Sequence, residues 1–260
     1  MTIAPARRHV EHVMGTAVSI DVRDGGLPET QTLAVIDRVV AWLHDVDARF
    51  STYRPESEIS RFGRAEIGID ELSRDVQDVL LACRELTALT DGAFDAFAVP
   101  APNGAMLDPS GYVKGWSIER AAEMLWDAGV VDACINAGGD VAVRGRPAPD
   151  LPWRIGIRHP EHADLLATVV ELVGPASVAT SATYERGAHI VDPRTRQPTA
   201  DIASATVVGP DLGRADAFAT AVFVMGLDGL DWIVDRPGYE AYVITHDGMT
   251  AWSPGFVPAR

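Results

Sequence analysis

The sequence predicts an α+β protein in which mixed or antiparallel sheets are flanked by helices in a two-lobed single domain. Segments with strand-like alternation and segments with helical periodicity come in separate runs, whereas a doubly wound parallel sheet requires regular alternation. The chain has 260 residues, of which 47% are hydrophobic. This length and composition suffice for one large domain or for two lobes that share a core.

The N-terminal half is expected to hold one long strand and several helices. A strand is predicted over residues 10–23, where Gly15 suggests a bulge or a close backbone approach. Apolar residues at helical spacing predict a helix over 29–50 and another over 73–90. A helical turn near 59–62 and a glycine-containing loop, 108–115, that feeds a helix at about 115–128 complete this half.

The C-terminal half is expected to be rich in strands. Two of its strands flank the tight turn around Gly138 and Gly139. Helices are predicted at 228–235 and in the apolar run that begins with Asp216. The predicted strands cover 131–135, 139–145, 153–158, 166–173, 176–180, 203–208, 241–246 and 249–253.

The formal net charge of -15 argues against non-specific binding of nucleic acid, which requires a basic surface. A phosphate-bearing ligand would need local neutralisation by Lys, Arg, backbone N–H groups or a metal. The two cysteines, Cys83 and Cys134, form neither a zinc pattern nor a disulfide framework. Residues 1–9 are expected to be a flexible N-terminus before a domain over 10–260, and they show no signal peptide or lipid-attachment cysteine. Because no apolar run reaches the length of a membrane span, we expect a cytoplasmic protein.

Asp216 and Thr220 are spaced four residues apart, which places both on one face of a helix. A carboxylate and a hydroxyl offer only oxygen ligands, and these suit Mg²⁺ better than zinc. The alternative is an ordinary capping arrangement near a helix start.

Two glycine-containing segments are candidates for ligand contact. Lys114 follows Asp108 across a loop with Gly111 and Gly115, which suits phosphate, although a solvated lysine in a turn is the alternative. The Asn136–Asp140 segment admits a ligand against bare backbone, or is simply a hairpin turn.

His189 lies in a charged loop near two arginines, so it is either a catalytic residue or an ordinary surface or core histidine. The chain lacks an HExxH motif, a Gly-x-Ser-x-Gly elbow and a GxGxxG motif after a strand. A zinc hydrolase, an α/β-hydrolase and a Rossmann dehydrogenase are therefore disfavoured.

Seven motifs in order resemble those of the ApbE family, the FAD:protein FMN transferases. The resemblance covers about residues 10–250 and implies an ApbE-like, T-fold-related architecture. The matching segments are Met14-Gly15-Thr16, Phe50-Ser51-Thr52-Tyr53, Gly92-Ala93-Phe94-Asp95, Asp108-Pro109-Ser110-Gly111-Tyr112-Val113-Lys114-Gly115, Asn136-Ala137-Gly138-Gly139-Asp140, Thr180-Ser181-Ala182-Thr183-Tyr184-Glu185-Arg186 with His189-Ile190-Val191-Asp192-Pro193, and Asp216-Ala217-Phe218-Ala219-Thr220-Ala221.

The resemblance implies Mg²⁺-dependent transfer of the FMN half of FAD to a Ser or Thr hydroxyl of an acceptor flavoprotein, with release of AMP. It implies a Mg²⁺ site formed by Asp216, Thr220 and the carbonyl of Gly111. Lys114 would stabilise phosphate charge, and either His189 or a nearby Asp would accept the hydroxyl proton. The implied FAD contacts are Met14, Tyr53, Ala93, Phe94, Asp95, Asp108, Lys114 and Ile190.

The sequence departs from the family pattern beside this site, at Pro109, Ser110, Val113 and Ala182. These positions affect loop geometry and leave the implied Mg²⁺ ligands unchanged. Family members are often exported lipoproteins, so the missing leader points to a cytoplasmic acceptor. Hydrolysis of FAD to FMN and AMP at the same site, and flavin binding without catalysis, remain the alternative functions.

Overall fold

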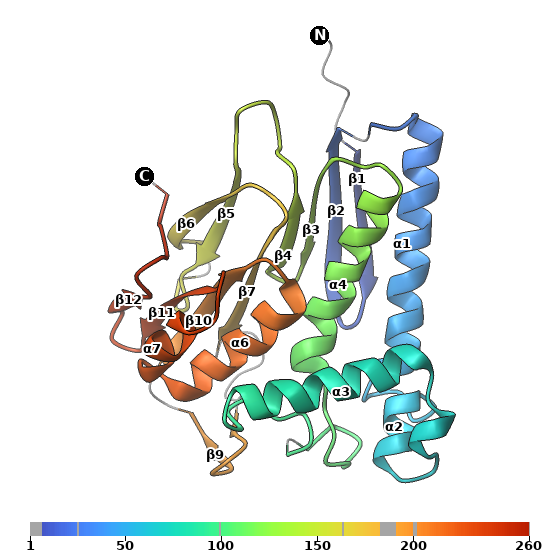
Figure 1. Ribbon diagram of the computed structural model, residues 1–260, viewed down its shortest axis with the longest axis vertical. Helices are drawn as coiled ribbons and strands as arrows, with labels where there is room; N and C mark the ends of the chain where they lie inside the picture. The colour runs from blue at the N-terminus through green and yellow to red at the C-terminus, as the bar shows by residue number, and fades with distance from the viewer. Residues whose placement is uncertain are drawn as a thin grey trace.

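A single eight-stranded antiparallel sheet forms the centre of the protein (Figure 1). The computed structural model describes residues 7–24, 26–98, 100–162, 164–182, 191–199 and 202–259. The strand order is β1-β2-β3-β4-β7-β10-β11-β12. These strands are β1 (Arg7–Val13), β2 (Thr16–Asp24), β3 (Asp132–Ala137), β4 (Asp140–Arg144), β7 (Ala176–Ala182), β10 (Ile202–Gly209), β11 (Glu240–Thr245) and β12 (Thr250–Trp252).

Helices cover one face of this sheet, and a separate hairpin covers part of the other. On the first face, α4 packs between α1 and α6 (Figure 1). On the second face, β5 and β6 pair with each other and pack over β4, β7 and β11. The remaining elements are α1 (Glu29–Phe50), α2 (Glu58–Gly63), a 3-10 turn (Ile69–Glu71), α3 (Arg74–Leu89), α4 (Ser110–Asp127), β5 (Trp153–Arg158), β6 (Leu166–Leu172), β8 (Val191–Asp192), β9 (Gln197–Pro198), α6 (Leu212–Met225) and α7 (Asp228–Val234).

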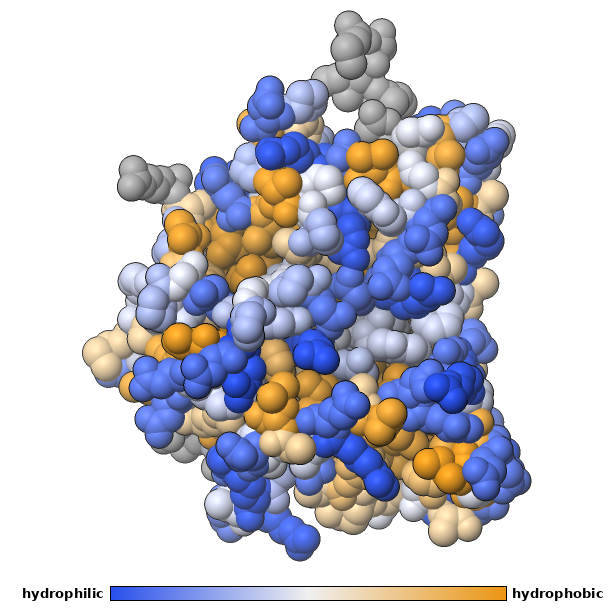
Figure 2. Space-filling view, in the orientation of Figure 1, coloured by the Kyte–Doolittle hydropathy of each residue, from blue (hydrophilic) through white to orange (hydrophobic). Residues whose placement is uncertain are grey.

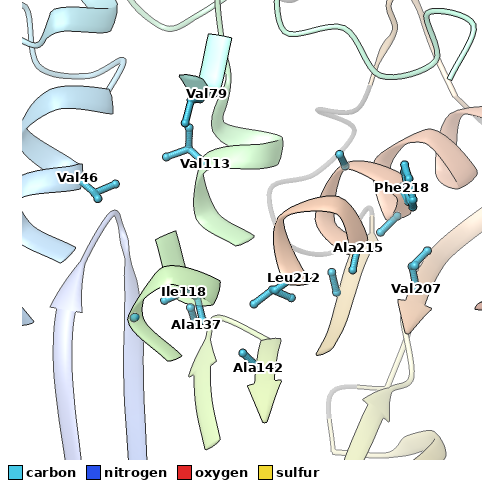
Figure 3. Close-up of a cluster of buried hydrophobic side chains, with 14 of the residues drawn as sticks. Val46, Val79, Val113, Ile118, Ala137, Ala142, Val207, Leu212, Ala215 and Phe218 are labelled. Atoms are coloured by element: carbon cyan, nitrogen blue, oxygen red, sulfur yellow. The ribbon is translucent and has the colours of Figure 1, made fainter. Parts of the chain in front are cut away.

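The larger hydrophobic core lies between the helices and the sheet (Figure 3). The spacing of Val35, Val39, Leu43 and Val46 turns one face of α1 into this core. Helix α6 is buried along most of its length, as its continuous apolar sequence predicts. This arrangement confirms the predicted α+β class and its antiparallel sheet.

The first predicted strand is wrong in one respect, because residues 10–23 form a hairpin rather than one interrupted strand. Strands β1 and β2 pair in register from Arg7 opposite Val22 to Val13 opposite Thr16. Met14 and Gly15 join them with φ values of 53° and 72°. Consecutive positive φ values favour the tight hairpin turns that match strand twist. Gly15 therefore marks a chain reversal and not a bulge.

Two helices begin earlier than the sequence predicts. Helix α4 starts at Ser110 and includes Gly111 and Gly115, whereas the sequence predicts a loop over 108–115. Helix α6 starts at Leu212, with the side chain of Asp211 accepting a hydrogen bond from the Arg214 N–H. In both cases tertiary packing overrides the low helix propensity of the first residues.

Hydrophilic residues cover most of the face shown in Figure 2, and apolar residues form separate patches between them. Within the described residues, no helix has the length and apolar character needed to span a membrane.

Candidate functional site

The close approach of α4 and α6 creates the candidate site. A Cβ atom at Gly115 would lie 2.4 Å from the carbonyl oxygen of Leu212 and 2.9 Å from the Cβ of Asp216. Only glycine fits so close to the backbone of the neighbouring helix. Gly115 therefore allows α4 to present its first turns directly to Asp216 and Thr220.

Asp216 is buried in this helix contact, with 3% of its surface exposed. Its Oδ2 accepts a hydrogen bond from the Gly115 N–H at 3.1 Å. The cap of α6 is Asp211, so the capping alternative for Asp216 is excluded. In a regular helix the Gly115 N–H would serve the carbonyl of Gly111. A backbone carbonyl has two lone pairs, so the Gly111 oxygen can accept a further ligand in addition to any helix hydrogen bond.

Thr220 lies one turn after Asp216 and faces both α4 and β7. A Cβ atom at Gly111 would lie 3.7 Å from the Thr220 Oγ1. The same Oγ1 lies 3.1 Å from the Oγ of Ser181 on β7. The structure thus places Gly111, Asp216 and Thr220 close to one another.

The donors in this group are a carboxylate, a hydroxyl and a backbone carbonyl. Among the described residues, no three His, Cys, Asp or Glu side chains are grouped so as to hold a metal ion. A site built on oxygen with a single carboxylate suits Mg²⁺, which keeps several waters and takes further oxygens from phosphate. The residues present therefore fit a Mg²⁺–phosphate complex better than a zinc site.

Lys114 on α4 forms an ion pair with Asp140, the first residue of β4. Its Nζ lies 2.6 Å from the Oδ2 of Asp140, whose side chain is fully buried. The Oδ1 of Asp140 accepts the Thr180 N–H at 3.1 Å. Lys114 is therefore held in place and is not a solvated lysine.

The Asn136–Asp140 segment is the hairpin turn between β3 and β4. The Gly139 N–H donates to the Oδ1 of Asn136 at 3.0 Å, and Gly138 has a φ of 62°. Gly138 lies so close to Thr16 that a Cβ atom would be 2.6 Å from its hydroxyl oxygen. The turn therefore packs against the β1–β2 hairpin, and it ends at Asp140.

Met14 lies beside Ser117, one turn along α4 from Lys114. The Ser117 hydroxyl is 3.7 Å from the Met14 Sδ and donates to the Lys114 carbonyl at 2.9 Å. The positive φ of Met14 turns the chain back at this point. The β1–β2 turn is thereby placed beside the first turns of α4.

The segment Ala93-Phe94-Asp95 packs against the start of α4. Ala93 and Phe94 are buried, and a Cβ atom at Gly111 would lie 3.3 Å from the Phe94 ring. The Asp108 N–H donates to the Ala96 carbonyl at 2.8 Å. The Oδ1 of Asp108 accepts the Ser110 N–H at 3.0 Å, which orders the entry into α4.

Tyr53 differs from this group in its exposure. It is 72% exposed in the loop after α1, and its N–H donates to the Oγ of Ser51 at 3.3 Å. His189 and Ile190 lie outside the described residues. The β8–β9 hairpin follows them and carries Arg194. Arg194 lies close to Gly92, the residue before Ala93: a Cβ atom added at Gly92 would be 3.4 Å from the Arg194 Cγ.

Arg194 in this hairpin is paired with Asp192. The two side chains are 2.9 Å apart. Hydrogen bonds from Arg194 lower the pKa of Asp192. Burial acts in the opposite direction but has a smaller effect. Asp192 is therefore the charged partner of Arg194 within the β8–β9 hairpin.

Sequence reasoning missed the roles of Gly115, Asp140 and Ser181. Gly115 was visible as a glycine next to Lys114, and Asp140 as the polar end of a glycine turn. Ser181 belongs to one of the matching motifs, but nothing in its spacing places it beside Thr220. Its place beside Thr220 depends on how β7 packs under α6.

Comparisons with known proteins identify the family of this chain. A profile described as the ApbE family matches residues 14–103 and 99–243. The FAD:protein FMN transferase of Haemophilus influenzae is 25% identical, over 89% of this chain and 84% of the relative. The protein of the same name from Vibrio cholerae is 27% identical, over 82% of this chain and 79% of the relative.

Solved structures show the same fold. The apo form of the Pseudomonas stutzeri flavinyl transferase ApbE superposes with a TM-score of 0.83 and 23% identity, over 98% of this chain and 97% of the other. The Thermotoga maritima ApbE protein gives a TM-score of 0.82 with 22% identity, over 96% and 97%. Because the family profile matches most of its length, this chain belongs to the ApbE family.

Proposed function

We propose that this protein transfers the FMN half of FAD to a Ser or Thr hydroxyl of an acceptor flavoprotein in a Mg²⁺-dependent reaction that releases AMP. The observation that carries this proposal is the convergence of Gly111, Asp216 and Thr220 beside the Lys114–Asp140 ion pair. The relatives from Haemophilus influenzae and Vibrio cholerae are named FAD:protein FMN transferases, which supports transfer of FMN from FAD to a protein.

The charge balance explains why this site needs local cations. The pyrophosphate of FAD carries two negative charges, and the chain carries a formal charge of -15. Mg²⁺ held by Asp216, Thr220 and the Gly111 carbonyl would neutralise the phosphates and draw charge from the breaking bond. Lys114, fixed by Asp140, would add a positive charge beside the same phosphates.

The proposed reaction forms one phosphorus–oxygen bond, breaks another and moves one proton. The acceptor oxygen attacks the phosphorus of the FMN half, and the bond to the bridging oxygen of the pyrophosphate breaks. AMP leaves with that oxygen, and FMN stays on the acceptor as a phosphoester. The hydroxyl proton passes to a base, for which His189 is the proposed residue.

The proposed flavin contacts divide into a buried and an exposed group. Ala93 and Phe94 are buried, with the Phe94 ring beside Gly111, whereas Met14 and Asp108 are half-buried. Tyr53 is exposed and is proposed to stack on the flavin ring, as an aromatic side chain favours. Asp95 and Ile190 complete the proposed flavin contacts.

The test is covalent labelling of an acceptor by fluorescent flavin. The protein is incubated with FAD, Mg²⁺ and a lysate of its own source, and flavin fluorescence is read on a denaturing gel. We expect one labelled acceptor with the natural protein and none with Asp216→Ala. Normal labelling by Asp216→Ala would contradict the assigned metal role.

Hydrolysis of FAD uses the same site with water as the nucleophile. The two reactions are separated by supplying FAD and Mg²⁺ without an acceptor and measuring AMP. A transferase releases AMP slowly until an acceptor is added. Rapid AMP release without an acceptor would favour hydrolysis instead.

A further inference from the structure

The hydroxyl group of Ser181 contacts the proposed metal ligand Thr220. Ser181 belongs to β7, and its side chain is turned toward α6 and is only 7% exposed. Its Oγ lies 3.1 Å from the Oγ1 of Thr220. This distance is within the normal range for a hydrogen bond between two hydroxyls, so one of them donates to the other.

The direction of this bond decides whether Thr220 can serve a cation. A hydroxyl has one proton and two lone pairs, and a metal ligand must turn a lone pair toward the ion and its proton away from it. A threonine inside a helix often donates its proton to the carbonyl four residues earlier. Among the described residues, the hydroxyls of Ser181 and Thr220 have only each other as side-chain hydrogen-bond partners. Ser181 is therefore the acceptor available for the Thr220 proton.

We propose that Ser181 is a positioning residue that accepts the Thr220 proton and thereby directs a Thr220 lone pair toward the cation. This inference rests on the proposed function, because it assumes that Thr220 binds the metal. Residues behind metal ligands commonly fix the orientation of those ligands in this way. Ser181 has no direct role in holding the ion.

The same strand supplies a matched control residue. Ser177 lies four residues before Ser181, so the alternation of the strand puts it on the same sheet face. It is fully buried, and its Oγ donates to the Gly209 carbonyl at 2.9 Å. Loss of either hydroxyl removes one buried hydrogen bond, and only the loss at Ser181 affects Thr220.

The experiment measures Mn²⁺ affinity by electron paramagnetic resonance on the full chain, with and without FAD. Mn²⁺ is the probe because it accepts the same oxygen ligands as Mg²⁺. We expect Ser181→Ala to weaken Mn²⁺ binding by about 10-fold or more, as for other residues behind metal ligands. Ser181→Thr retains the hydroxyl and is expected to restore the affinity. Ser177→Ala is expected to bind Mn²⁺ as the natural protein does.

A double variant tests whether Ser181 acts through Thr220. In a Thr220→Val background, adding Ser181→Ala is expected to cause no further loss of Mn²⁺ affinity. If Ser181→Ala does not fold, Ser181→Cys keeps the volume with a weak acceptor and carries the same expectation. Unchanged Mn²⁺ affinity in Ser181→Ala or Ser181→Cys, or an equal loss in Ser177→Ala, would overturn the inference.

Failure of this inference is distinguishable from failure of the proposed function. If Asp216→Ala abolishes both Mn²⁺ binding and labelling while Ser181→Ala binds Mn²⁺ normally, only the role of Ser181 is refuted. If Asp216→Ala still labels the acceptor, the metal site and the proposed mechanism are refuted together.

Discussion

Replacing Gly115 with alanine would force α4 and α6 apart where they hold the candidate site. The new Cβ would lie 2.4 Å from the Leu212 carbonyl oxygen and 2.9 Å from the Asp216 Cβ. Both neighbours belong to a buried helix with little freedom to move. We therefore expect the two helices to shift, which displaces Gly111 relative to Asp216 and Thr220.

The stability cost follows from two opposing contributions. Overpacking a close contact costs about 1–3 kcal/mol. Alanine in place of glycine returns about 1 kcal/mol of helix propensity. Because the clash is with backbone, the cost lies at the upper end, which leaves a net loss of about 2 kcal/mol. For a domain of this size, such a loss lowers the thermal midpoint by about 4–8 °C.

The functional loss should exceed what this destabilisation explains. At 25 °C a protein that loses about 2 kcal/mol remains almost entirely folded. Acceptor labelling and Mn²⁺ affinity are nevertheless expected to fall by about 10-fold or more, because metal ligands tolerate little displacement.

Gly156→Ala provides the control for overpacking. A Cβ atom at Gly156 would lie 2.7 Å from the Leu166 Cδ2, in the β5–β6 hairpin that packs on the opposite face of the sheet from α4 and α6. Gly156→Ala is expected to lose some thermal stability while keeping labelling per folded molecule. Equal labelling by Gly115→Ala and the natural protein would refute the view that this close contact builds the site.

Three further perturbations test the surrounding structure. Glu119→Ala leaves the buried Arg144 without its partner and should cost about 3–5 kcal/mol in chemical denaturation, whereas Glu171→Ala in an exposed pair should cost less than about 1 kcal/mol. Burial is the main cause that raises the pKa of the Cys83 and Cys134 thiols to about 12, and nearby carboxylates add to it. Both thiols should resist a thiol reagent at pH 8 until the chain is denatured. Because thiols in the unfolded chain ionise at lower pH, the free energy of unfolding should fall above about pH 9. Chelation by EDTA should abolish acceptor labelling, and excess Mg²⁺ should restore it.

Local patterns predicted most of the fold. The strongly periodic segment 29–50 is a helix with the predicted bounds, because apolar spacing alone determines its buried face. The first strand was misread because single-sequence periodicity does not distinguish a bulge at Gly15 from a two-residue turn. The start of α4 was missed because its glycines lower helix propensity, and only the packing against α6 explains their presence.

The candidate site was predictable where its residues share one helix and not where they come from different elements. Asp216 and Thr220 share a helix, so their relation follows from spacing. The contact between Lys114 and Asp140 depends on how α4 lies over β4, which no local pattern specifies. The contact between Ser181 and Thr220 likewise depends on the packing of β7 against α6.

Two ion pairs, each with a buried carboxylate, tie α4 to opposite ends of β4. Lys114 contacts Asp140 at the first residue of the strand, and Glu119 contacts Arg144 at its last. Glu119 also accepts the N–H of Leu212, at the start of α6. Buried pairs often add little net stability, because desolvation offsets their attraction. In this protein we infer that they specify the position of α4 along the sheet, and that position determines where its first turn meets α6.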